Sequence, residues 1–160
     1  MKNRFLLLMP LALGLTFAGC KKDSPSATPA PTKTELLTNR NWVITAATIS
    51  PGLPNPNGGS PITDLYAQFG ACDKDDFIRF EAASVFKEDE GATKCSSSSS
   101  QTRVGTWAFG SNDTVITIGG TVDNSGSYNV ADLSDNTLKL NQSYPYNGVN
   151  YTIAVTYTKK

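Results

Sequence analysis

The sequence contains no histidine and carries no net charge, and these two absences exclude several classes of function. Without histidine, the chain has no base for a Ser-His-Asp triad and lacks a common ligand of zinc sites. Its 14 basic residues are balanced by 14 acidic ones, so no basic surface for nucleic acid is expected. We therefore expect a protein that is not an enzyme, with no catalytic residues, no cofactor and no nucleic-acid partner.

A long apolar run is also missing, because the most hydrophobic segment, residues 5–17, is shorter than the ~20 residues of a membrane-spanning helix. Basic residues precede this segment, and the small residues Ala18 and Gly19 lead from it to Cys20. This order is typical of a secretory signal peptide. It also resembles the lipobox of bacterial lipoproteins, in which signal peptidase II cuts before a cysteine that carries lipid. We predict a lipoprotein signal peptide at residues 1–19 and lipidation of Cys20; the alternative is a general secretory signal that happens to contain a cysteine.

Residues 21–33 are rich in Pro, Ser, Thr and Ala and poor in large apolar side chains. Such a segment cannot bury enough surface to fold, so we predict a flexible tether over residues 20–34 and a folded domain over residues 35–160. Lys21 and Lys22 follow Cys20, a start that resembles the export tags of some outer-membrane and surface lipoproteins. The predicted location is the cell envelope, lipid-anchored at the outer membrane, with the cell surface as an alternative. The membrane is the expected partner.

The predicted domain contains two more cysteines, Cys72 and Cys95. An even pair in an exported protein, where the compartment is oxidising, predicts a disulfide. A bridge that closes a loop of about 24 residues should stabilise the fold by about 3.4 kcal/mol in the chain-entropy model. The alternative is a pair of free thiols with redox or metal chemistry, which the absence of a Cys-x-x-Cys spacing disfavours.

Eight segments of alternating apolar and polar residues, bounded by turn residues, predict an all-β domain. They cover residues 42–49, 76–81, 84–88, 102–109, 114–118, 126–133, 136–143 and 149–158. Short connections make neighbouring strands antiparallel. A β-sandwich, the alternative, usually needs a long Greek-key crossover, and the one long connection lies between the first two strands. We therefore predict an eight-stranded antiparallel up-and-down barrel. Trp42 and Trp107 are interpreted as core residues at its base rather than as pocket lining.

The long connection, residues 50–75, predicts a lid over the mouth of the barrel. Ile62, Leu65, Tyr66 and Phe69 follow helical spacing, and Pro61 and Gly70 mark the start and stop of a short helix. A single helical turn is also indicated near residue 35, where Thr32 and Glu35 have the spacing of a capping box. Tyr144 and Tyr146 flank a turn and are expected at the same mouth. The candidate ligand-binding residues are Tyr66, Phe69, Tyr144 and Tyr146.

The order of several short motifs resembles the bacterial lipocalin-like domain lipoproteins. These motifs are Leu36-Leu37-Thr-x-x-x-Trp42, a Pro/Gly-rich loop, Thr63-Asp64-x-Tyr66, Ala71-Cys72-x-x-Asp75-Asp76, Glu90-Gly91-x-x-Lys94-Cys95 and Gly105-Thr106-Trp107. Classical lipocalins have a Gly-x-Trp at the first strand, whereas Arg40 precedes Asn41 and Trp42 here. The resemblance implies a small calyx-like barrel, and a fold alone does not specify a function.

Acidic residues are the remaining candidates for chemistry. Asp73, Asp75 and Asp76, with Glu88, Asp89 and Glu90, offer oxygen ligands for Ca²⁺, but their spacing is not that of an EF-hand loop. We interpret them as a solvated turn at the start of a strand and expect no metal site. A pair of carboxylates on one hairpin, Glu81 and Glu88, is also what glycoside hydrolysis requires, but charged hairpins are common.

Two functions remain, because eight strands enclose either a small cavity or a core filled by side chains. Small inward residues, for which Ala46, Gly105 and Ala154 are the candidates, favour a cavity. We predict that the anchored barrel binds a small apolar or amphipathic molecule at its mouth. The alternative is a non-enzymatic structural or interaction lipoprotein of the cell envelope with a filled barrel and no ligand.

Overall fold

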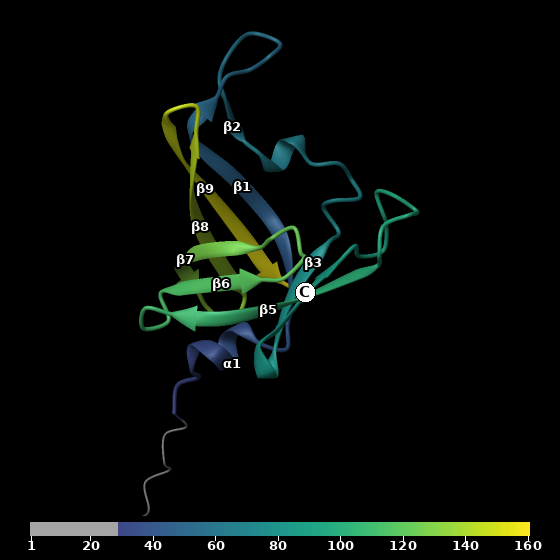
Figure 1. The fold of residues 1–160 in the computed structure, drawn as a ribbon, viewed down its shortest axis with the longest axis vertical. Helices are drawn as coiled ribbons and strands as arrows, with labels where there is room; N and C mark the ends of the chain where they lie inside the picture. Colours follow the sequence, from purple (N-terminus) through teal and green to yellow (C-terminus); the bar gives the residue numbers. More distant parts are fainter. Residues whose placement is uncertain (1–28) are drawn as a thin grey trace, which may run out of the picture. The chain divides into compact units, whose positions relative to one another are not determined.

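The protein, of which a computed structural model describes residues 29–160, folds into a closed antiparallel β-barrel (Figure 1). Each barrel strand pairs with the next along the chain, and the last pairs with the first, which closes the sheet. The prediction of an eight-stranded up-and-down barrel is confirmed. Its strands are β1 (Asn41–Leu53), β3 (Phe77–Glu81), β4 (Val85–Asp89), β5 (Thr102–Gly110), β6 (Val115–Gly119), β7 (Gly126–Leu133), β8 (Thr137–Tyr146) and β9 (Val149–Lys159).

Strands β1, β8 and β9 are long, and Figure 1 shows them extending well beyond the short strands of the barrel. The turn that joins β8 to β9 consists of Asn147 and Gly148, both with positive φ angles of 48° and 77°. Asn-Gly is the preferred sequence for such a turn, because these residues adopt left-handed conformations at the lowest cost. A short 3₁₀ turn, η2 (Ala82–Ser84), joins β3 to β4.

A β-bulge at Thr45 changes which residues of β1 face inward. Ile44 pairs with Tyr157 and Ala46 pairs with Thr156, so Thr45 is an extra residue on β1. Beyond the bulge the inward positions are Ala47 and Ile49, which are 2% and 3% exposed. Simple alternation along the sequence would place Ile49 on the face opposite to Trp42, and the extra residue at Thr45 brings it to the inward face instead.

The base of the barrel is closed by helix α1 (Lys33–Leu37), at the bottom of Figure 1. Its capping box is the predicted one: the Thr32 hydroxyl accepts from the Glu35 N–H, and the Glu35 carboxylate accepts from the Thr32 N–H. Leu37 is fully buried, and its carbonyl accepts a hydrogen bond of 2.9 Å from the Trp42 indole. This contact couples the helix to the first strand.

Aromatic side chains fill the lower part of the barrel. Phe80 packs edge-on against Trp107 at 5.5 Å and lies 5.2 Å from Phe86, and Trp107 also meets Phe109 edge-on. Such tilted pairs are favourable beyond the area they bury. The Trp107 indole donates to the Glu81 carbonyl at 2.9 Å, so its polar atom is satisfied. Trp107 is a core residue, as expected.

The expected lid helix in the long connection is absent. Residues 62–64 form instead a three-residue strand, β2 (Ile62–Asp64), which pairs with β1, and a 3₁₀ turn, η1 (Tyr66–Gln68), follows. The upper part of β1 offers backbone groups that no other strand takes on that side, and the Leu65 N–H bonds to the Ala47 carbonyl. Because Ile62 and Thr63 are β-branched, pairing with β1 outweighs the helical spacing of the apolar residues.

Within residues 29–160, no helix has the length and apolarity needed to cross a membrane. The predicted signal peptide and Cys20 lie outside the described residues.

Candidate ligand-binding site

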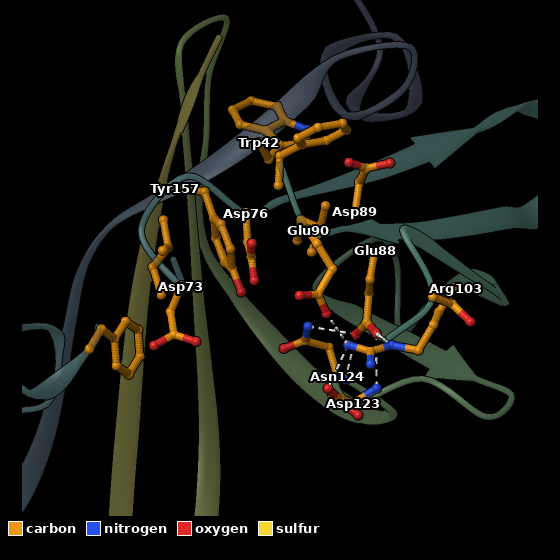
Figure 2. Close-up of a pocket in the computed structure, with 15 residues that line it drawn as sticks. Trp42, Asp73, Asp76, Glu88, Asp89, Glu90, Arg103, Asp123, Asn124 and Tyr157 are labelled. Carbon is orange, nitrogen blue, oxygen red and sulfur yellow. Dashed lines mark hydrogen bonds and ion pairs between the residues drawn. The ribbon is translucent and has the colours of Figure 1, made fainter. Parts of the chain in front are cut away.

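A cavity of about 340 Å³ opens at the end of the barrel opposite α1. Its wall comes from β1, β3, β4, β5 and β9, from the segment that precedes β3, and from the loops that join β4 to β5 and β6 to β7 (Figure 2). The lining residues are Trp42, Ile44, Phe69, Asp73, Asp76, Phe77, Ile78, Glu88, Asp89, Glu90, Ser100, Arg103, Asp123, Asn124 and Tyr157. Its volume is at the lower end of the ~300–1,000 Å³ of ligand pockets, so the site suits a small molecule.

Apolar side chains form one part of the lining. Trp42 is fully buried, Ile78 is 5% exposed, and Ile44 packs beside them. Trp42 is therefore both a core residue and part of the cavity wall, although its sequence context predicts a core residue alone. Tyr157 is 7% exposed, and burial raises the pKa of its hydroxyl far above the usual value.

Glu88 holds the loop between β6 and β7 over the cavity. This carboxylate is 6% exposed, and its Oε1 accepts hydrogen bonds of 2.6 Å from the backbone and the side-chain amide of Asn124. Its Oε2 accepts from the Asp123 N–H at 3.0 Å and from the Arg103 Nε at 3.2 Å. The two oxygen atoms of Glu88 thus accept four hydrogen bonds, which is the number that a buried carboxylate can accept. Glu88 is therefore a structural anchor of the loop.

Arg103 is the single cation of the cavity lining, and it is committed to carboxylates of the protein. Besides Glu88, it contacts Asp123 at 2.6 Å and Glu90 at 3.9 Å. Partial burial works against the charge of the guanidinium, but the hydrogen bond to Glu88 and the charges of Asp123, Glu88 and Glu90 outweigh it and raise the pKa of Arg103. Arg103 is therefore fully charged and already paired.

Asp76 is the least compensated acid of the lining. Its Oδ1 is buried and has no hydrogen-bond partner among the described residues. Burial, followed by the negative charges of Glu90, Asp75 and Asp73, raises the pKa of Asp76 to about 6, against the opposing effect of Arg103. At neutral pH the folded protein therefore carries an unfavourable charge at this position.

Asp89 also lines the cavity, but its pKa is shifted in the opposite direction from that of Asp76. Burial raises its pKa, but hydrogen bonds from Thr102, Gln101 and the Gly91 N–H outweigh this effect, so the pKa of Asp89 is lowered. The pKa of Asp89 is thus lowered and that of Asp76 is raised, because Asp89 accepts several hydrogen bonds whereas Asp76 has an oxygen that accepts none.

A disulfide joins two parts of the cavity wall. Cys72 and Cys95 are bonded, with their Cα atoms 5.2 Å apart, so the segment before β3 is linked to the loop between β4 and β5. Asp75 reinforces this link, because its Oδ2 accepts the N–H groups of Ala92 and Thr93 at 2.8 Å each. Gly91 has a φ of +64°, and a Cβ there would lie 2.4 Å from the Asp75 carbonyl, so only glycine allows the two segments to approach so closely.

The four residues predicted to bind a ligand lie in three places. Phe69 lines the cavity, and Tyr66 packs edge-on against it at 5.9 Å, with the Lys74 ammonium 4.9 Å from the Tyr66 ring centre. Tyr144 and Tyr146 lie on β8 beside its turn, stacked on each other at 6.1 Å and about half exposed, and they do not line this cavity. The structure thus brings Phe69 to the site directly and Tyr66 only through Phe69.

The small residues that were expected to leave space inside the barrel do not create the cavity. Ala46 and Ala154 lie on the outward face, because the inward neighbours on their strands are Ala47 and Val155. Gly105 is inward, but a Cβ there would lie 2.4 Å from the Gly119 carbonyl and 3.2 Å from the Val122 methyl groups. The space beside Gly105 is already filled.

The acidic residues were interpreted as a solvated turn, and this does not hold for Glu88. Ile78 pairs with Glu88 across β3 and β4, and both face inward, as does Phe86. The inward position of Glu88 could be read from the sequence, since Glu88 is two residues from Phe86 and therefore on the same face of the strand.

Glu81, in register with Val85, lies on the opposite face, where it pairs with Arg79 and Lys87. Glu81 and Glu88 therefore cannot act together on one sugar ring.

The carboxylates of the cavity do not converge tightly. Three potential metal ligands among the described residues, Cys72, Asp73 and Cys95, have atoms that all lie within 4.8 Å of one another. The two sulfur atoms of that group are bonded to each other in the disulfide. The described acids around Asp76 do not form such a group of three.

Comparison with known proteins agrees with the geometry of the barrel. No curated protein matches the chain. A family of lipocalin-like domains does match, over residues 39–140, from just before β1 to the middle of β8. The match covers more than half of the chain, and the closed eight-stranded meander with its cavity at the mouth has the architecture that the match implies. The chain belongs to the family of lipocalin-like domains.

Proposed function

We propose that the barrel binds a small amphipathic molecule in the cavity at its mouth. The observation that carries this proposal is the cavity of about 340 Å³, whose lining combines apolar side chains with polar and charged ones. Apolar walls with a few oriented polar groups are the usual composition of a small-molecule site. A lipocalin-like barrel is in general a binding fold without catalytic activity, which agrees with this function.

The alternative is a barrel that holds no ligand and serves a structural role in the cell envelope. The packed aromatic residues Phe80, Phe86 and Trp107 favour it for the lower half of the barrel. They do not extend to the mouth, where Trp42, Ile44 and Ile78 border the cavity.

Filling the cavity separates the two functions. We expect the neutral fluorescent probe N-phenyl-1-naphthylamine to bind the wild-type chain with one saturable site. Ile44→Phe, which adds a ring inside the cavity, should weaken that binding by about tenfold or more, because overpacking a small site excludes the ligand. The measurement is a fluorescence titration, together with native mass spectrometry of protein purified from its host.

Val104→Phe is the matched control, because Val104 is 61% exposed and lies on the outer face of β5. It should leave the affinity unchanged. Equal binding by wild type and Ile44→Phe would locate the probe elsewhere. No probe binding and no co-purified molecule would favour the filled barrel.

We further propose that Cys20 carries lipid and anchors the barrel to the outer membrane. The support is the sequence: a short apolar segment, small residues before Cys20, and a tether of small and polar residues after it. Two or three acyl chains, at about 0.8 kcal/mol for each buried CH₂ group, give durable attachment.

Cys20→Ala should move the protein from the membrane fraction to the soluble fraction, as measured by fractionation and immunoblotting. Lys21→Ala is the control and should stay in the membrane fraction, because it preserves the cysteine. Continued membrane association of Cys20→Ala would rule out this anchor.

A further inference from the structure

The cavity has an excess of negative charge that the protein does not neutralise. Its lining contains six carboxylates, from Asp73, Asp76, Glu88, Asp89, Glu90 and Asp123, and a single guanidinium. Glu88 and Asp89 are satisfied by hydrogen bonds from the protein, Asp73 is exposed and accepts the Gly70 N–H at 2.8 Å, and Asp123 pairs with Arg103. The uncompensated charge is therefore concentrated on Asp76 and Glu90.

Asp76 and Glu90 face the same space, as Figure 2 shows. The side chain of Glu90 is 12% exposed, and its ion-pair partner among the described residues is Arg103, at the long distance of 3.9 Å. Asp76 has a buried oxygen with no partner. Two partly buried carboxylates repel each other unless a positive charge lies nearby, and a bound cation would remove that cost.

A second feature of the cavity points to a ligand independently of the acids. Tyr157 is 7% exposed and lines the cavity from β9, and Figure 2 shows its ring among the lining side chains. Its hydroxyl makes no hydrogen bond within residues 29–160. The enclosed side-chain atoms of these residues that lack a partner belong to Asp75, Asp76 and Arg79, so the Tyr157 hydroxyl is not one of them and is open to the cavity, where it can bond a ligand.

We infer that the cavity selects a small organic amine, with its ammonium between Asp76 and Glu90 and its apolar part against Trp42, Ile44 and Ile78. This inference rests on the proposed function, since it specifies the ligand of the same cavity. The described acids around Asp76 do not form a group of three ligand atoms within 4.8 Å of one another, whereas an ammonium group on an apolar stem fits both the acidic and the apolar part of the lining. The ligand also supplies the hydrogen-bond partner that the Tyr157 hydroxyl lacks.

The test uses three probes of the same size that differ in charge: 4-phenylbutylamine, 4-phenylbutan-1-ol and 4-phenylbutanoate. Binding is followed by the fluorescence of Trp42 in the full chain with Trp107→Phe, since the sequence has only these two tryptophans and Trp42 lines the cavity. We expect the amine to bind at least about tenfold more tightly than the alcohol, and the carboxylate to bind most weakly, because hydrogen bonds to charged groups are the stronger ones.

Asp76→Asn should remove the preference for the amine and leave the affinity for the alcohol unchanged. The substitution preserves the shape of the side chain, and we expect the melting temperature to stay the same or rise, because the unpaired charge is lost. Asp113→Asn is the matched control: it removes one carboxylate from an exposed turn at the base and should not alter any of the three affinities.

Each other result has a distinct meaning. Equal binding of amine and alcohol would overturn this inference and leave the proposed function intact, whereas failure of all three probes to bind would overturn both. An amine preference that survives Asp76→Asn would show that another group selects the charge. Displacement of the amine by CaCl₂, with direct Ca²⁺ binding that Asp76→Asn abolishes, would replace the amine site by a metal site.

Discussion

Trp42→Ala is expected to lower the free energy of unfolding by about 4 kcal/mol, the largest effect of any single substitution considered for this barrel. The Trp42 side chain is fully buried, and its indole donates to the Leu37 carbonyl at 2.9 Å. Alanine would leave a void beside Ile78 and Ile44, and the carbonyl at the end of α1 would lose its partner. The two losses act together, because helix α1 is attached to the barrel through this residue.

Equilibrium unfolding in urea, followed by circular dichroism, measures this effect. Trp42→Phe is the informative companion variant: it retains most of the apolar volume but loses the hydrogen bond, so it should cost about half as much. Val104→Ala, on the exposed outer face, should change stability by less than about 0.5 kcal/mol. A loss of less than 1 kcal/mol for Trp42→Ala would show that the base of the barrel does not depend on this side chain.

Glu88→Gln is expected to lower the free energy of unfolding by about 3 kcal/mol. The change is nearly isosteric, but the amide has one acceptor oxygen where the carboxylate has two. Its NH₂ group would face either the donors of Asn124 or those of Asp123 and Arg103. Because Glu88 is 6% exposed, water cannot replace the lost contacts.

An exposed ion pair provides the control for Glu88→Gln. Asp135 pairs with Arg40 and Lys159 at 2.8 and 2.9 Å, but its side chain is 63% exposed. Asp135→Asn should therefore cost less than about 1 kcal/mol, as exposed pairs usually do. If the two substitutions have equal effects in urea unfolding, the network around Glu88 is not a specific anchor of the loop between β6 and β7.

The barrel could be predicted from the sequence because its strands are encoded locally. Inward residues such as Trp107 and Phe109 alternate with outward ones, and short turns such as Asn147-Gly148 require antiparallel neighbours. The bulge at Thr45 could not be predicted, since it is visible only in the pairing of β1 with β9. The helix expected over residues 61–70 was wrong because a vacant stretch of β1, distant in sequence, pairs with Ile62–Asp64.

The cavity was harder to predict than the fold. Phe69 was identified as a ligand-binding candidate, and it does line the cavity, although from an extended segment rather than from a helix. The roles of Asp76 and Glu88 depend on which strands and loops close the barrel and on which hydrogen bonds remain for each carboxylate. One carboxylate has four such bonds and the other has an oxygen with none, a difference that the sequence around them does not reveal.

The three residues of β2 have a consequence for the behaviour of the protein at high concentration. On one side, β1 pairs with β9 almost along its full length, but on the other side β3 covers only Asn41 to Val43. Without β2, the remaining part of β1 would be a free strand edge, able to recruit a second chain and begin aggregation. By pairing with Thr48 and Leu53, β2 occupies that edge with a piece of the same chain. The segment that was expected to cover a ligand thus protects the barrel from self-association.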